Sequence, residues 1–72
     1  MQKEPTYTYL ELLHHIKICD ADTLMVLIEL LAEEAKLYTR IEAEYLYANI
    51  WLAVNRFKEY RVINFFKLLN NH

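Results

Sequence analysis

The chain of 72 residues contains no glycine, and its single proline is Pro5. Glycine adopts positive φ at little steric cost, and tight turns and many helix C-termini require that conformation. β-Sandwiches, barrels and phosphate-binding loops depend on such turns, so a glycine-free chain argues against all three. We therefore expect an all-α protein whose turns are made by Asn, Asp and ordinary residues.

Two Thr-x-x-Glu sequences mark helix starts. In Thr8–Glu11 and again in Thr39–Glu42, the hydroxyl and the carboxylate can each accept a hydrogen bond from the other residue's backbone amide. The first box predicts a helix over 9–18. Either aspartate of Asp20-Ala21-Asp22 can cap a second helix, expected over 23–37. The second box predicts a separate third helix, but a single helix continuing from 23 into the fifties stays open.

The apolar pattern changes phase after Asn55. Continuing the stripe of Ile50, Val54 and Phe57 leads to polar positions, while a new stripe appears between residues 62 and 69. This predicts a kink or short turn near 58–61 and a fourth helix to about Leu69. We expect one domain, 1–72, forming a small bundle of three to four short helices, with 1–7 flexible and 70–72 frayed.

The composition is unusually apolar for so short a chain. Hydrophobic residues other than glycine make up 56% of it, whereas roughly 40% is typical on the same basis. A small domain buries the smallest share of its surface, about 60% at 60 residues. Part of the apolar excess should therefore lie on the surface, where it would bind another protein or a second copy of the chain.

The third helix concentrates large aromatic residues. Tyr45, Tyr47 and Trp51 fall on at least two stripes, and Tyr45 shares its stripe with Ile41, Ala48 and Leu52. Tyrosine and tryptophan are favoured at interfaces because they bury a large area and keep a polar tip. We expect these three residues to bind a partner, with the acidic Glu33-Glu34 region tuning specificity. That they simply fill the core is the alternative.

The net charge of −2 hides an acidic centre and a basic end. Residues 20–44 carry a net charge of −5, and residues 55–72 carry +3. The basic end interleaves cations with aromatic rings, as nucleic-acid surfaces do, although four cations are a small footprint. The alternative function is a small transcription regulator that touches DNA through these cations, which are Arg56, Lys58, Arg61 and Lys67.

No constellation of side chains indicates catalysis. His15 and Cys19 share a helix face at metal-ligand spacing, but a structural zinc site needs four ligands. The glutamates at 33, 34, 42 and 44 lack the Glu-x-x-His partner of dimetal bundles and fit solvated helix faces. We expect no enzyme activity, no cofactor and no metal site.

The sequence also bears on cellular location. The lone Cys19 fits a reducing compartment, and no secretory signal is visible at the polar start of the chain. The longest nearly uncharged runs, 24–32 and 45–55, are far shorter than a membrane span. We expect a cytoplasmic protein.

One stretch resembles a known family. Asp22-Thr23-Leu24 followed by Ile28-Glu29, in an all-helical chain of this length, is similar to the Hha/YmoA group of small bacterial gene-regulatory proteins. That resemblance implies association with DNA indirectly, through a nucleoid-structuring protein. It covers only the second helix and the layout of the chain. The Ala-Ala-Asp-His-Arg segment of the group's third helix has no counterpart, since Trp51 and its neighbours stand there, so no site residue is carried over.

Overall fold

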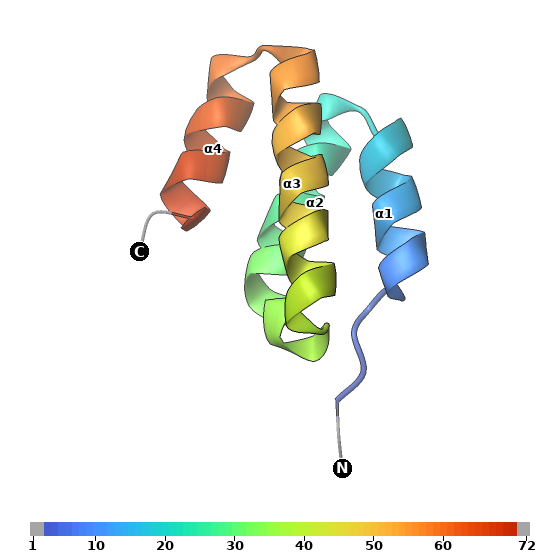
Figure 1. Cartoon of the computed structure of the whole chain (residues 1–72). Helices are drawn as coiled ribbons and strands as arrows, with labels where there is room; N and C mark the ends of the chain where they lie inside the picture. Colours follow the sequence, from blue (N-terminus) through green and yellow to red (C-terminus); the bar gives the residue numbers. More distant parts are fainter. Residues whose placement is uncertain (1–2, 71–72) are drawn as a thin grey trace.

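The computed structural model describes residues 3–70, which form four α-helices and one short 3-10 helix and contain no strand (Figure 1). The elements are α1 (Tyr9–Ile18), α2 (Ala21–Glu34), η1 (Ala35–Leu37), α3 (Arg40–Phe57) and α4 (Tyr60–Asn70). The predicted all-α bundle is confirmed. Residues 1–2 of the segment expected to be flexible, and 71–72 of the end expected to fray, lie outside the described residues.

Helix α3 is the centre of the bundle. Figure 1 shows it between α1 and α4, with α2 behind it, and each of these helices packs against it. Helix α4 packs against α2 as well, whereas α1 and α2 contact each other only slightly. The core consists of twelve buried apolar residues: Leu12, Ile16, Ala21, Leu24, Leu27, Ile28, Leu31, Leu46, Ile50, Ala53, Val54 and Val62. Within residues 3–70, no helix has the length and the continuous apolar run that a membrane crossing requires.

Both predicted capping boxes are present. The Glu11 amide donates to the Thr8 hydroxyl over 3.2 Å, and the Thr8 amide donates to the Glu11 carboxylate over 2.9 Å. The corresponding pair at the start of α3 is formed by Thr39 and Glu42. Asp20 caps α2 by accepting from the Thr23 amide over 2.8 Å, so this helix begins two residues earlier than we predicted.

The connection between α2 and α3 is a genuine break. The last turn of α2 tightens into η1, and Tyr38 then takes an extended conformation at φ −106° and ψ 163°. The capping box at Thr39 starts α3 afresh. The two helices are therefore separate, and the alternative of one continuous helix is wrong.

The turn between α3 and α4 lies at the predicted kink. Lys58 ends α3 in the left-handed region, at φ 56° and ψ 35°, and its amide donates to the Val54 carbonyl over 3.1 Å. Glycine is the usual residue in this position, since a side chain makes the left-handed conformation cost roughly 1–2 kcal/mol. In this glycine-free chain, a lysine therefore adopts the strained left-handed conformation that ends the helix.

The segment that precedes α1 folds back over the far end of α2. The amide and the hydroxyl of Thr6 each donate to a different carboxylate oxygen of Glu34 over 2.8 Å. The Tyr38 hydroxyl donates to the Tyr7 carbonyl over 2.6 Å. Thr6 and Tyr7, in the segment expected to be flexible, therefore make long-range hydrogen bonds.

Glu34 is consequently buried, with only 7% of its surface exposed. The two hydrogen bonds from Thr6, backbone first, hold the pKa of its carboxyl below the ordinary value, although desolvation acts in the opposite direction. The prediction that Glu34 belongs to a solvated helix face is wrong. The reason is that a segment 28 residues earlier covers it, and helix periodicity carries no information about such a contact.

Candidate interaction surfaces

The outer side of α3 carries an exposed apolar stripe. It consists of Ile41, Tyr45, Ala48 and Leu52, which follow one another at helical spacing, and we call these four residues the α3 face. The exposed fractions are 79% for Ile41, 53% for Tyr45 and 65% for Leu52. The opposite side of the same helix supplies core residues, so α3 is apolar on both sides.

Polar side chains border the α3 face. Arg40 and Glu44 form an exposed ion pair at 3.2 Å near the start of the helix. The side-chain amides of Asn49 and Asn55 donate back to carbonyls one turn earlier. Exposed pairs of this kind contribute little to stability. These four polar residues give the α3 face the polar rim that is usual around a protein interface.

Tyr45 lies at the edge of the α3 face that adjoins α1. Its ring is 6.4 Å from the ring of Tyr9, measured between centroids. Desolvation, together with the neighbouring Tyr45 hydroxyl and the carboxylate of Glu42, raises the pKa of Tyr9. The apolar surface therefore extends from α3 onto the first turn of α1.

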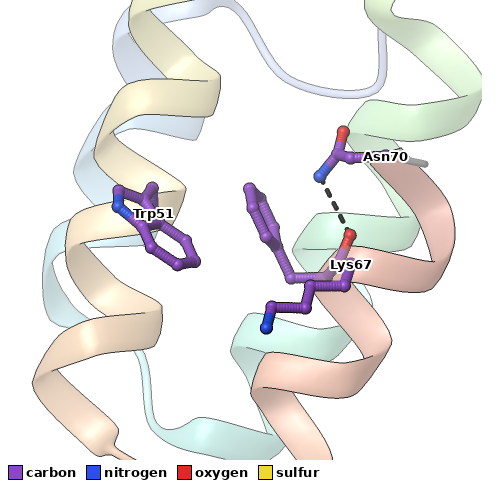
Figure 2. A pocket seen from close by; sticks show the side chains of 4 residues that line it. Trp51, Lys67 and Asn70 are labelled. Carbon is purple, nitrogen blue, oxygen red and sulfur yellow. Dashed lines mark hydrogen bonds between the residues drawn. The ribbon is translucent and has the colours of Figure 1, made fainter.

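Trp51 lies at the opposite edge, toward α4. Its ring is 5.4 Å from that of Phe66, and the two rings are inclined at 30°. Together with Lys67 and Asn70 they line an open groove between α3 and α4 (Figure 2). Figure 2 shows the Lys67 side chain extending from α4 toward α3, while the Asn70 amide donates to the Phe66 carbonyl over 3.0 Å.

The remaining predicted site residues lie elsewhere. Tyr47 is half-buried against the core, and burial raises the pKa of its hydroxyl. Glu33 is exposed on α2, and Glu34 binds Thr6. The structure therefore brings Tyr45 and Trp51 onto the two edges of one helix surface and does not bring Tyr47, Glu33 or Glu34 together with them.

The four cations of the basic end have different surroundings. Arg61 pairs with Asp22 at 2.6 Å and with Glu59 at 3.0 Å. The Arg56 guanidinium lies 4.8 Å from the ring of Phe57. The other two are Lys58 in the α3–α4 turn and Lys67 at the groove. Direct DNA binding through these cations stays a prediction, which a salt titration with duplex DNA tests.

His15 of α1 and Cys19, the residue that follows the helix, both make local contacts. The ring of His15 packs 4.7 Å from that of Tyr7, and the Cys19 thiol donates to the Ile16 carbonyl over 3.4 Å. Desolvation raises the pKa of the Cys19 thiol. Among residues 3–70, no three His, Cys, Asp or Glu side chains converge as a metal site would require.

Two large residues of the α3 face were not among the predicted site residues. Ile41 and Leu52 share the stripe of Tyr45, but aromatic character alone directs attention to the tyrosines and Trp51. The sequence does contain a pattern that identifies them: Leu46 and Ile50 already form an apolar side that can face the core, so the stripe of Ile41 and Leu52 is a second one. A second apolar stripe on one helix indicates a surface in excess of what the core needs.

Comparison of the chain with protein-family models, with curated proteins and with solved structures gives no match. The α3 face offers apolar area, a phenolic hydroxyl and a polar rim, which together suit contact with another protein.

Proposed function

We infer that this protein is a small helical interaction module that binds a partner protein through the α3 face. The observation that supports this function most strongly is the exposure of Ile41, Tyr45 and Leu52 on one stripe of the central helix. Scattered apolar residues are normal on a protein surface, but a contiguous stripe with a polar rim is typical of a binding site. Trp51 adds an aromatic side chain at the edge of this surface.

Burial of the α3 face supplies part of the energy that specific binding requires. Complete burial of a large apolar side chain contributes about 1.5–3 kcal/mol. The three large residues of the face begin half to four-fifths exposed, so most of that contribution is still available to a partner. Part of it offsets the loss of translational and rotational freedom on association.

Helix α3 is also a rigid platform for binding. Its inner side is held by four buried residues, and α1, α2 and α4 all pack against it. Little backbone ordering is then required when a partner binds, so more of the interaction energy contributes to affinity. The partner that fits such a surface presents its own apolar groove or helix, with polar groups that meet Arg40 and Glu44.

Site-specific photo-crosslinking tests this function. A photoreactive phenylalanine analogue replaces Ala48 at the centre of the α3 face or, as the matched control, Thr23 on the exposed surface of α2. Expressed in cells of the source organism, the chain should form a discrete adduct from position 48 and none of that mass from position 23. The adduct should disappear when Leu52→Asp is added. Identical adducts from both positions, or none from position 48, would contradict the proposal.

The contribution of Trp51 is tested separately. Because Trp51 is 42% exposed and is not part of the buried core, Trp51→Ala should leave the helical circular dichroism spectrum intact. It should weaken the captured partner's binding severalfold. A folded variant with unchanged affinity and unchanged oligomeric state would remove Trp51 from the binding surface.

A further inference from the structure

The outer side of α4 is a second exposed surface, separate from the α3 face. Tyr60, Asn64 and Leu68 follow one another at intervals of four residues, and we call them the α4 face. Tyr60 is 83% exposed and Leu68 is 71% exposed. Val62 is the only residue of α4 that is fully buried, so this helix contributes one side to the core and leaves its outer side uncovered.

One edge of the α4 face is acidic. Arg61 pairs with Asp22 at 2.6 Å, which places Asp22 on the side of α2 that lies next to α4. Glu29 follows Asp22 by seven residues, or two helical turns, and therefore lies on the same side of α2. Glu29 is exposed, and no ion pair within residues 3–70 involves it.

The opposite edge of the α4 face is basic. Lys67 follows Arg61 by six residues, which turns it roughly 120° around α4, away from α2. It lies instead at the groove that Trp51 and Phe66 line on the α3 side. Across the described residues, its ammonium group takes part in none of the ion pairs.

The two charged edges are at the same height. Helices α2 and α4 start at the same end of the bundle and run in the same direction (Figure 1), with Asp22 and Arg61 side by side near their starts. At a rise of about 1.5 Å per residue, Glu29 is about 10 Å further along α2, and Lys67 is about 9 Å further along α4. The carboxylate and the ammonium group thus lie at one level, on either side of the α4 face.

We propose that a second copy of this chain binds the α4 face, around a two-fold axis that runs parallel to α4. Such an axis brings the basic edge of one copy opposite the acidic edge of the other at the same height. Lys67 of each copy then pairs with Glu29 of its partner, so two identical ion pairs flank the apolar contact. Leu68 of one copy packs against Leu68 of the other at the centre.

Charge complementarity favours a second copy over a different protein. A surface with exposed Tyr60 and Leu68 between edges of opposite sign is complementary to itself under this rotation, as an isologous dimer requires. A surface with the same charge on both edges would repel its own copy and select an oppositely charged partner. This inference does not depend on the proposed function, because the α3 face stays free in such a dimer.

Charge reversal tests the proposal directly. In Lys67→Glu both edges are acidic, and in Glu29→Lys both are basic, so each variant alone should dimerise at least tenfold more weakly than the original chain. Mixed in equal amounts, the two variants should form a heterodimer, because one copy then has two acidic edges and the other has two basic edges. Each acidic edge can pair with a basic edge of the other copy. Sedimentation equilibrium measures the first effect, and native mass spectrometry identifies the heterodimer by its mass.

Matched controls separate this effect from a general loss of charge. Lys36→Glu, at an exposed lysine of η1, should leave the dimerisation constant unchanged, and every variant should keep the helical circular dichroism spectrum. Leu68→Asp should abolish the dimer without unfolding an exposed position. A chain that stays monomeric at millimolar concentration, or a mixture that forms no heterodimer, would overturn the proposal. Loss of the crosslink at position 48 alone would overturn only the proposed function.

Discussion

The left-handed lysine at the end of α3 leads to a quantitative prediction. At φ 56° and ψ 35°, the Cβ of Lys58 costs roughly 1–2 kcal/mol relative to an ordinary helical conformation. Glycine removes that penalty but loses more backbone entropy on folding, which offsets about 0.4–1 kcal/mol. We expect Lys58→Gly to be about 1 kcal/mol more stable than Lys58→Ala, which keeps the Cβ and removes the same charge.

The comparison with alanine is necessary because Lys58 also interacts with the C-terminal end of the α3 dipole. Loss of that charge costs roughly 0.3–1 kcal/mol in either variant. Relative to the original chain, Lys58→Gly should therefore gain about 0.5 kcal/mol. For a domain of this size, the difference of about 1 kcal/mol between the glycine and alanine variants corresponds to about 4–8 °C in melting temperature.

Urea unfolding followed by circular dichroism measures these differences. A matched pair at Arg56, within the last turn of α3, should show the opposite order, with Arg56→Gly about 1 kcal/mol less stable than Arg56→Ala. The reasoning is refuted if Lys58→Gly is no more stable than Lys58→Ala. That outcome would mean that position 58 carries no left-handed strain.

Three further variants test other parts of the fold by the same unfolding assay. Leu46→Ala, at a residue with no exposed surface, should lose about 2–5 kcal/mol, and a loss below 1 kcal/mol would contradict its place in the core. Thr39→Ala removes the cap of α3 and should cost about 1 kcal/mol, whereas Thr23→Ala, whose hydroxyl caps nothing, should stay within 0.5 kcal/mol. Glu34→Gln should cost about 1.5–3 kcal/mol at pH 7, because it removes the charge that accepts both Thr6 donors. The pKa of Glu34 is lowered in the folded protein, so this contribution is present above the ordinary value of about 4.5 and lost as the pH falls through the folded value. The difference between Glu34→Gln and the original chain should therefore shrink at pH 3, and an unchanged difference would show that the Glu34 charge does not stabilise the fold.

Most of the fold was predictable from local sequence. The Thr-x-x-Glu boxes at Thr8 and Thr39 gave the starts of α1 and α3, because a capping box involves residues only three apart. The shift of the apolar stripe after Asn55 located the turn before α4 for the same reason. The second helix differed at both ends: Asp20, the first of two candidate aspartates, caps it, and its expected last turn is the 3-10 helix η1.

Contacts between distant segments were not predictable in this way. The burial of Glu34 depends on Thr6, and the separation of Tyr45 from Trp51 depends on where α1 and α4 pack around α3. Periodicity assigns residues to stripes of a helix, but it does not say which neighbour covers each stripe. The candidate surfaces were therefore only partly predictable: the aromatic residues were identified, while the α3 face as a whole needed the fold.

The central position of α3 also has a consequence for how the protein forms. Helix α1 packs chiefly on α3 and only slightly on α2, although α2 follows it directly in the chain. A nascent chain that ends before residue 40 thus has the apolar sides of its first two helices exposed, because α3, which packs on both, and α4, which packs on α2, have not been made. The core cannot close until α3 has left the ribosome, and until then the exposed apolar sides of α1 and α2 are prone to aggregation.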